Sequence, residues 1–172
     1  VCKMAQTVGA EVFPVDIGVN TDRIFPGVIS RKVKKGTNDF LLKPAMSERE
    51  AMQAVRVGME LVKECKEAGY TLLGTGEMGI GNTTTSAAMA AALLSVPPEI
   101  VAGRGAGLSD EGLATKRRVI ADALEKYQLR GTEPMRILCS VGGLDIAGLC
   151  GVFLGGAKYH MPIVADGVIS AV

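Results

Sequence analysis

The sequence predicts an α/β fold, in which a mainly parallel sheet is flanked by helices in a Rossmann-like, three-layer core. Its predicted strands and helices follow the order strand, helix, strand, helix, helix, strand, which is typical of parallel sheets with helical crossovers. Hydrophobic residues make up 48% of the chain but aromatic residues only 4%, so small side chains allow helices to lie close to the sheet. A chain of 172 residues suits one domain with a well-buried core, and residues 1–172 are expected to form a single unit.

The first part of the chain predicts a strand, a long excursion and a helix. Residues 12–19 fit a buried strand, although Pro14 argues against pairing in the middle of a sheet. Residues 21–46 carry scattered proline, glycine and basic residues, which indicates a surface excursion with a short strand near residues 29–33. The next helix is expected to begin with a capping box at Ser47–Glu50. Its apolar positions recur at helical spacing, and its two methionines are expected to fill the core: Met52, Val55, Met59, Val62 and Cys65.

The middle of the chain predicts a short strand and two helices. Residues 70–74 read as a short apolar strand. Either Asn82 or Thr83 is placed to cap the Ala-rich helix that follows, and either Ser109 or Asp110 to cap the next one.

The C-terminal part contains one ambiguous segment and two clearer ones. Residues 135–141 are compatible with a helix or a strand, and the pattern does not decide between them. Asp145 is favoured as the cap of a helix that is apolar nearly all round and is therefore expected to be buried. Residues 161–165 predict the last strand, which ends at Asp166.

Charge and cysteine content argue against several classes of function. The formal net charge of +1 gives no general attraction to nucleic acid or to a membrane surface. The four cysteines form no C-x-x-C pair, so a zinc site is not expected. They read as reduced thiols, for which a cytoplasmic location is the simplest expectation. The chain begins at Val1 and stops just after an apolar strand, which suggests a piece of a longer protein.

The most informative segment is the glycine-rich loop at residues 74–84, Gly-Thr-Gly-Glu-Met-Gly-Ile-Gly-Asn-Thr-Thr. Glycine lets backbone approach a ligand closely, and a loop that opens a helix presents free N–H groups that favour a phosphate. Glu77 is unexpected there, because a carboxylate repels a phosphate. A sugar carbon that gains positive charge during a reaction would reconcile the two. Asp16 and Asp166 are expected near this loop, beyond the carboxyl ends of their strands.

Two other interpretations of this loop are open. Gly74–Gly79 matches G-x-G-x-x-G after a predicted strand, which is typical of dinucleotide sites. However, Ile80–Asn82 delay the helix, and the acidic residue expected about 20 positions further on would be Glu99, which follows a proline pair rather than a strand. A purely structural glycine turn is the other alternative, although it leaves Glu77 unexplained.

A second glycine loop, Gly103–Gly107, precedes a helix with three basic residues in its first turns. Cations are unfavourable there because of the helix dipole, and a bound phosphate near the loop would offset that cost. For Lys116, a phosphate contact and a solvated basic patch are equally good interpretations. For Arg117 and Arg118 the solvated patch is preferred.

Together these segments resemble the nicotinate-nucleotide–dimethylbenzimidazole phosphoribosyltransferase family of cobalamin lower-ligand assembly. The segment Gly76–Thr84 is the specific part of the resemblance, and the others support it by their order and spacing. The matching pieces span nearly the whole chain: Val15–Val19, Gly76–Thr84, Gly103–Leu108, Lys116, Val141–Asp145 and Asp166–Gly167.

The resemblance implies a cytoplasmic homodimer that transfers phosphoribose from nicotinate mononucleotide to a benzimidazole base, giving nicotinate and α-ribazole phosphate. It places Glu77 at the ribose, where a carboxylate stabilises positive charge developing at the anomeric carbon. It implies no metal or other cofactor, because the nicotinium ring is already a cationic leaving group. The phosphate is implied to lie near Gly79, Gly105 and Lys116. The full set of implied substrate-binding residues is Gly76, Met78, Gly79, Asn82, Thr83, Gly105, Lys116 and Asp166.

The chain departs from the family in ways that limit this expectation. Family members are substantially longer, and their general base, a glutamate, lies in a C-terminal segment with no counterpart here. An early Asp-His-Gly element is also missing. We therefore expect weak nucleotide binding and little turnover from this chain alone. Two alternatives stay open: an NAD(P)-dependent oxidoreductase, from the G-x-G-x-x-G match, and a non-catalytic nucleotide-binding domain, from the missing base.

Overall fold

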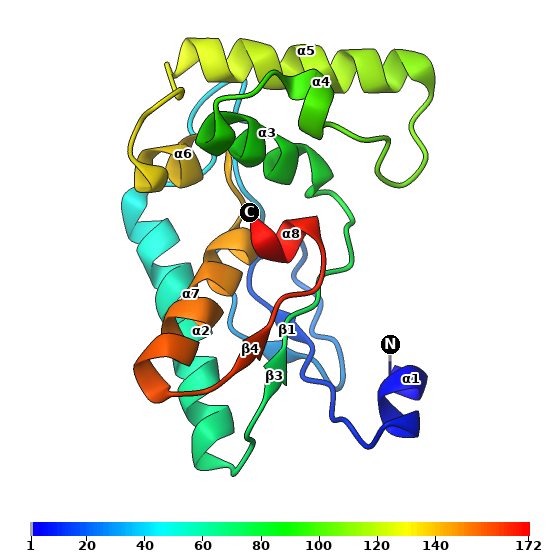
Figure 1. Ribbon diagram of the computed structural model, residues 1–172, viewed down its shortest axis with the longest axis vertical. Coiled ribbons are helices and arrows are strands. Elements are labelled where there is room, and N and C mark those ends of the chain that lie inside the picture. The colour runs from blue at the N-terminus through cyan, green and yellow to red at the C-terminus, as the bar shows by residue number, and fades with distance from the viewer. Residues whose placement is uncertain (1) are drawn as a thin grey trace.

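The computed structural model describes residues 2–172 and shows an α/β arrangement in which helices predominate (Figure 1). Both strand pairs are parallel, so the predicted fold class is confirmed. Within the described residues the strands are β1 (Val15–Asp16), β2 (Ile29–Ser30), β3 (Leu73–Gly74) and β4 (Ile163–Val164). The helices are α1 (Cys2–Thr7), α2 (Glu48–Glu67), α3 (Thr83–Leu94), α4 (Pro98–Val101), α5 (Asp110–Lys126), α6 (Pro134–Val141), α7 (Leu144–Tyr159) and α8 (Val168–Ala171).

The strands form two separate two-stranded sheets, β1 with β2 and β3 with β4. Val15 pairs with Ile29, and Leu73 pairs with Ile163. Each strand is shorter than the apolar run that predicted it, because within the described residues it has a partner on one side only. The predicted strand at residues 12–19 shortens most, since Pro14 has no N–H to donate and the preceding Val12 and Phe13 are exposed.

Helices α2 and α7 lie side by side along the long axis of the molecule (Figure 1). The predicted capping box begins α2: Ser47 Oγ accepts from the Glu50 N–H, and the Glu50 carboxylate accepts from the Ser47 N–H. Glycines set the distance between the two helices. A Cβ at Gly58 would lie 2.0 Å from the carbonyl oxygen of Gly148, and one at Gly151 would lie 2.0 Å from that of Val55. Backbone therefore packs on backbone along this seam.

Two expectations about these helices are corrected. Met52 is 37% exposed, because the buried face of α2 is formed by its small residues, with Met59 packed at the edge of the core. Helix α7 is buried only where it meets its neighbours. Cys150 and Leu154 face outward, the latter with 50% of its surface exposed, so uniform apolar composition does not make the whole helix internal.

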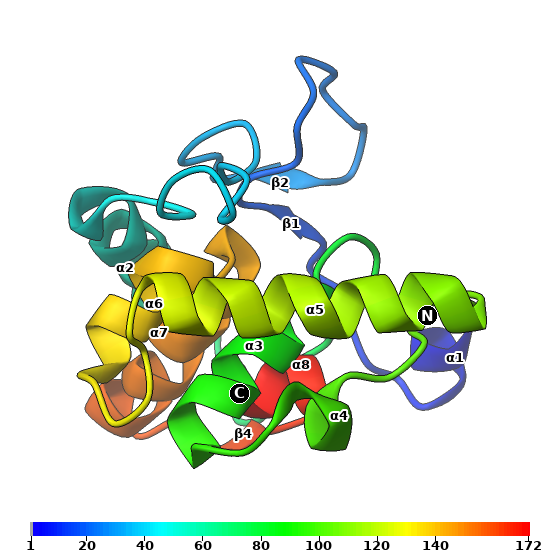
Figure 2. The same cartoon turned by 90° about the horizontal axis from the view of Figure 1, so that it is seen from above.

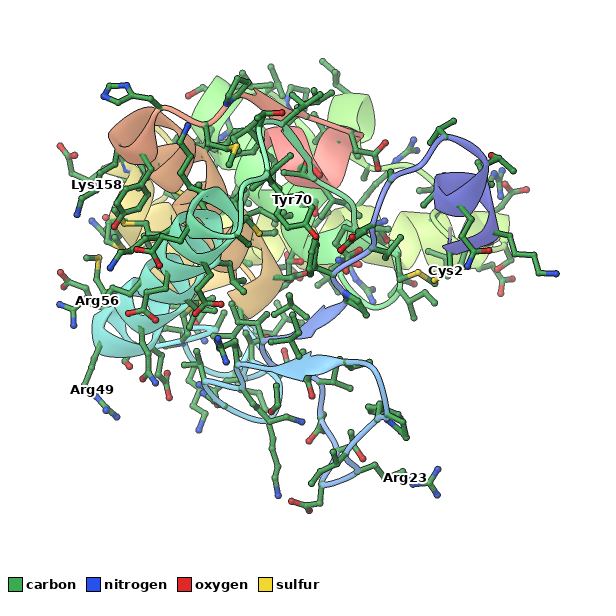
Figure 3. The ribbon with its side chains drawn as sticks, turned by 90° about the horizontal axis from the view of Figure 1, so that it is seen from below. Cys2, Arg23, Arg49, Arg56, Tyr70 and Lys158 are labelled. Atoms are coloured by element: carbon green, nitrogen blue, oxygen red, sulfur yellow. The ribbon has the colours of Figure 1, made fainter. Side chains whose placement is uncertain are left out.

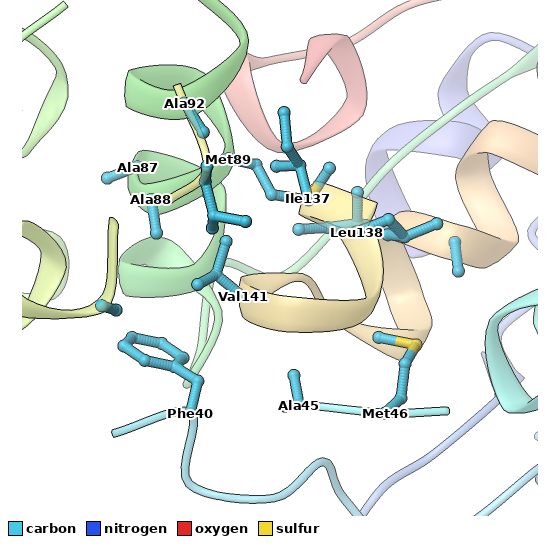
Figure 4. Packing of buried hydrophobic residues seen from close by; sticks show 14 of the residues in the cluster. Phe40, Ala45, Met46, Ala87, Ala88, Met89, Ala92, Ile137, Leu138 and Val141 are labelled. Carbon is cyan, nitrogen blue, oxygen red and sulfur yellow. The ribbon is translucent and has the colours of Figure 1, made fainter. Parts of the chain in front are cut away.

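The main core lies between α3, α5 and α6. Helix α5 runs across α3 (Figure 2), and the Ala-rich face of α3 meets α6 (Figure 4). Residues 135–141, for which the sequence pattern did not decide between helix and strand, lie in a helix, α6. It begins at Pro134, in a first-turn position where a missing N–H is tolerated. Buried residues from both helices fill the contact: Ala87, Ala88, Met89, Ala92, Ile137, Leu138 and Val141.

Residues 21–39 form the predicted surface excursion, with β2 as its short strand, but the end of the predicted range is buried, since Phe40, Ala45 and Met46 belong to the core. Arg23 points into solvent from its outer part (Figure 3). The returning part is tied to α5, since Lys126 Nζ donates to the carbonyl oxygen of Leu42 at 2.9 Å and the Tyr127 hydroxyl to that of Phe40 at 2.9 Å. In residues 2–172, no helix combines the length and the hydropathy that crossing a membrane requires.

Candidate phosphate and ribose site

The glycine-rich loop and Asp166 leave the same end of the β3–β4 pair. The Thr75 N–H donates to the Val164 carbonyl at 2.9 Å, which extends the pairing by one residue. The Thr75 hydroxyl then accepts from the Asp166 N–H at 3.2 Å. The Asp166 side chain is exposed at this end. The carboxyl ends of two parallel strands thus meet at the loop, as the sequence predicts for a ligand site.

Asp16 does not join this group. It lies on β1 in the other sheet and is 6% exposed. Its carboxylate accepts from the N–H of Val19 at 2.9 Å and pairs with the Lys32 ammonium at 3.0 Å. Burial acts to raise the pKa of Asp16, but the Val19 N–H and Lys32 outweigh it, so this pKa lies below its ordinary value of 3.8. Asp16 is therefore a structural anchor of β1.

Glu77 is half-buried and folds back on its own loop, where its carboxylate accepts the N–H of Gly79. Gly79 has φ +72°, a left-handed conformation that glycine adopts without strain. This contact orients the carboxylate and also occupies one of the loop amides expected at the phosphate. The neighbouring Met78 and Ile80 point outward, each 74% exposed.

The loop leads directly into the N terminus of α3, and no side chain caps the first amides of this helix. Asn82 is the N-cap residue, but its side chain makes no capping hydrogen bond. Its carbonyl accepts from the Ser86 N–H at 2.9 Å, so Ser86 is the first residue of the helix to donate in the regular pattern. The N–H groups of Thr83, Thr84 and Thr85 precede that pattern. They carry the positive end of the helix dipole, which suits an anion.

Lys116 of α5 reaches this same helix terminus from inside the protein. It is 5% exposed, and its Nζ donates to Thr83 Oγ1 at 2.9 Å and to the Gly103 carbonyl at 3.0 Å. Burial lowers the pKa of Lys116 below 10.5. Among residues 2–172 it forms no ion pair with a carboxylate. A buried ammonium without a counter-ion is costly, and a bound anion would supply the missing charge.

Gly105 brings the second glycine loop against the same threonine. Its φ is +55°, and a Cβ there would lie 2.8 Å from Thr83 Oγ1. Loop and helix therefore approach more closely than any side chain at position 105 allows. The loop itself is exposed, so the three groups Lys116, Thr83 and Gly105 form a clamp at the surface.

The remaining predicted basic residues do not join the clamp. Arg118 is exposed, and Arg117 is half-buried with its Nε unpartnered. Asp145 corrects the sequence prediction, because Gly143 is the N-cap residue of α7 and Asp145 makes no capping bond. Its carboxylate instead accepts from Asn82 Nδ2 at 2.5 Å. Local capping rules miss such a contact, although the preceding Gly142–Gly143 pair was a signal of tight packing.

Two hollows of the surface lie elsewhere. One of about 180 Å³ is enclosed by the excursion and lined by Asp16, Phe25 and Lys32 among others. The second, a groove of about 790 Å³, lies between the start of α2 and α6. Neither is lined by a residue of the clamp. In the part of the chain that the structure describes, no three His, Cys, Asp or Glu side chains gather as metal ligands would.

A helix terminus with free amides, a buried lysine and two glycine loops is an arrangement suited to binding a phosphorylated ligand. Comparison with known families agrees: a family model described as phosphoribosyltransferase matches residues 1–172. The chain therefore belongs to this phosphoribosyltransferase family.

Its curated relatives include nicotinate-nucleotide–dimethylbenzimidazole phosphoribosyltransferases. The protein of that name from Geobacter sulfurreducens is 49% identical over 168 residues, which cover 97% of this chain and 48% of the relative. The one from Clostridium perfringens is 42% identical over 172 residues, covering 100% and 48%. Among solved structures, CobT from Thermus thermophilus matches with a TM-score of 0.90 and 39% identity, covering 98% of this chain and 50% of that one. This chain thus spans about half the length of the relatives it matches.

Proposed function

We propose that this chain is the single α/β core of an enzyme that transfers phosphoribose from nicotinate mononucleotide to dimethylbenzimidazole or a related base. The products are α-ribazole phosphate and nicotinate, in cobalamin lower-ligand synthesis. One observation carries the proposal: Lys116 is buried without a carboxylate partner among the described residues and lies beside the uncapped N terminus of α3. Relatives that match 100% and 97% of the chain carry that name.

The phosphate of the nucleotide would be held by three kinds of group. The amides of Thr83–Thr85 donate to its oxygens, Lys116 supplies the charge, and Gly105 lets the second loop close over it. The Thr83 hydroxyl accepts from Lys116, which leaves its own proton free to donate to a phosphate oxygen. Hydrogen bonds to a charged acceptor are stronger than neutral ones.

Glu77 would face the ribose, while the amides at the start of α3 and Lys116 hold the phosphate. As nicotinate leaves, positive charge develops at the anomeric carbon, and a carboxylate held in place stabilises it. The Gly79 N–H would stay with Glu77 and keep the carboxylate oriented, so Gly79 lies near the phosphate without donating its amide to it. Gly76, Met78, Asn82 and Asp166 complete the proposed substrate-binding set. Asn82 contributes through the backbone that begins α3, and Asp166 reaches the site from the end of β4.

The reaction needs a base that takes a proton from the incoming benzimidazole nitrogen. The chain spans about half of its relatives, and we propose that the base and the homodimer contacts belong to the other half. The chain alone is then expected to bind nicotinate mononucleotide and to release nicotinate slowly.

Calorimetric titration of the chain with nicotinate mononucleotide, α-ribazole phosphate and NADH tests the proposal. We expect the two phosphoribosyl ligands to bind. NADH should bind at least tenfold more weakly, which is a difference of about 1.4 kcal/mol in binding free energy. Binding of NADH alone would instead support the oxidoreductase that the G-x-G-x-x-G match suggested. Binding of none of the three would contradict the proposal.

The role of Glu77 is tested in a protein that contains the whole catalytic unit. Glu77→Gln keeps the size of the side chain and removes its charge, so nicotinate release is expected to slow by about 100-fold, the scale of losing one electrostatic contact to a transition state. Affinity for the nucleotide should change little. An unchanged rate would show that this carboxylate does not act at the ribose.

A further inference from the structure

Asn82 behaves differently from the two serine N-cap residues, Ser47 and Ser109. Ser47 and Ser109 have extended backbones, with ψ 158° and 170°, and each accepts a hydrogen bond from a first-turn N–H of its own helix. Asn82 has ψ −2° and accepts none. Asparagine is among the best capping residues, but a capping side chain needs an extended backbone, so both the backbone and the side chain of Asn82 are held out of the capping geometry.

The group that holds it is Asp145, from α7. Asn82 Nδ2 donates to Asp145 Oδ2 at 2.5 Å, across 63 residues of sequence. An ionised carboxylate only accepts hydrogen bonds, so the amide must turn its NH₂ towards Asp145. The Asn82 Oδ1 atom, the one that would cap the helix, is buried and has no partner among the described residues.

The backbone before Asp145 is shaped to seat this carboxylate. A Cβ at Gly143 would lie 2.2 Å from Asp145 Oδ1. Only glycine at position 143 therefore leaves room for the carboxylate in its present position. Gly143 and Asp145 belong to α7, whereas Asn82 begins α3, so the contact joins two helices at the site.

We propose that Asp145 is a positioning residue that keeps the N terminus of α3 uncapped by withdrawing the Asn82 side chain from it. The free amides of Thr84 and Thr85 then remain available to the phosphate, so the inference rests on the proposed function of that terminus. Without Asp145, the Asn82 backbone is free to adopt the extended capping conformation, and its side-chain oxygen then accepts one of these N–H groups. Asn82 and the phosphate would then compete for the same donors.

Amide hydrogen exchange tests the first half of this inference without any ligand. In Asp145→Ala, exchange at Thr84 or Thr85 should slow about fivefold, the scale of one capping bond. In Asp145→Asn the side-chain oxygen still accepts from Asn82, so exchange should match the wild type. Unchanged exchange in Asp145→Ala would overturn the inference, whether or not the protein binds a nucleotide.

Titration with inorganic phosphate and with nicotinate mononucleotide tests the second half. Asp145→Ala should lower the affinity for both ligands about fivefold, because the new capping bond must be broken before they bind. Asp145→Asn should retain wild-type affinity. The double variant Asn82→Ala, Asp145→Ala has no side chain that caps, so it should bind more tightly than Asp145→Ala. A double variant as weak as Asp145→Ala would overturn the inference, as would a weakened Asp145→Asn.

A second route to the same state guards against misfolding of Asp145→Ala. Gly143→Ala displaces the carboxylate and leaves its charge in the protein, and should also slow exchange at Thr84 or Thr85. Wild-type exchange in a folded Gly143→Ala protein would count against the inference. Wild-type protein that binds neither ligand would contradict the proposed function, while the exchange results would still decide the role of Asp145.

Discussion

The Nζ atom of Lys116 lies 2.9 Å from Oγ1 of Thr83, so a buried ammonium contacts the first turn of a helix whose dipole disfavours a cation. An anion bound at that turn would relieve both costs. Lys116→Met is therefore expected to lower the affinity for nicotinate mononucleotide at least tenfold, because a hydrogen bond to a charged group contributes about 1.5–3 kcal/mol. Calorimetric titration measures the change.

Lys126→Met is the matched control for this variant. It removes a cation from the same helix, but one that donates to the carbonyls of Leu41 and Leu42, far along α5 from the clamp. The affinity of the Lys126→Met protein for the nucleotide should equal that of the wild type. Equal losses in the two variants would mean that net charge, and not the position of Lys116, governs binding.

The lowered pKa of Lys116 predicts two opposite pH dependences on the alkaline side. A bound phosphate favours the ammonium, so affinity should fall as pH rises through the lowered pKa, which lies below 10.5. The unfolded chain binds more protons than the folded one between that pKa and 10.5. The contribution of Lys116 to the stability of the ligand-free protein should therefore rise with pH over the same window.

Titrations and urea unfolding at several alkaline pH values measure the two slopes. Phosphate monoesters are fully ionised there, since their second pKa is about 6, so the ligand adds no slope of its own. The slope in affinity should disappear in Lys116→Met. The slope in stability is measured as the difference between the wild type and this variant, because both proteins share the groups whose pKa is raised: Cys65, Tyr70, Cys139 and Cys150. A slope in affinity that persists in this variant would assign the titration to another group.

Gly105→Ala should disturb the site more than the fold. A Cβ at Gly105 would lie 2.8 Å from Thr83 Oγ1, whereas one at Gly107 meets no atom within 4 Å. Both positions have positive φ, so both alanine variants should lose roughly 1 kcal/mol of unfolding free energy. Only Gly105→Ala should also weaken the nucleotide several-fold, measured by titration. Equal affinities in the two variants would show that the close approach to Thr83 is not used.

Asp16→Asn should destabilise the protein at neutral pH. Since the folded pKa of Asp16 lies below 3.8, its contribution is fully present above 3.8 and is lost as pH falls through the folded pKa. We expect a loss of about 1–3 kcal/mol at pH 7, which shrinks in acid, measured by urea unfolding. Asp22→Asn is the control, because Asp22 pairs with Lys35 at the surface, where such pairs contribute little. A constant difference down to low pH would contradict this account.

Local patterns in the sequence predicted the longer helices, whereas the strands are shorter than predicted and the short helices α1, α4 and α8 were not expected. The capping box at Ser47 and the glycine loops follow rules that depend on neighbours within a few residues. The short strands did not follow from such rules, because pairing depends on which distant segments meet: β3 finds β4 some ninety positions away, at Leu73 and Ile163, and neither joins β1.

The candidate site shows the same division. Lys116 and Thr83 were both candidate binding residues, and the structure brings them into contact. Asp145 was assigned to capping because an acidic residue near a helix start usually stabilises its own helix. Its actual partner, Asn82, belongs to another helix, and no local rule reports a contact over that separation. The sequence also left open whether Asn82 or Thr83 caps α3, because both residue types are good N-caps.

The seam of glycines between α2 and α7 has a consequence for the position of Asp145. Because main chain meets main chain at Gly58 and Gly151, the offset between these helices is set by backbone atoms rather than by side chains. Asp145 lies in the first turn of α7, so its position depends on where this seam places the helix. A single methyl group added at either glycine would force the two backbones apart and carry the acid with them.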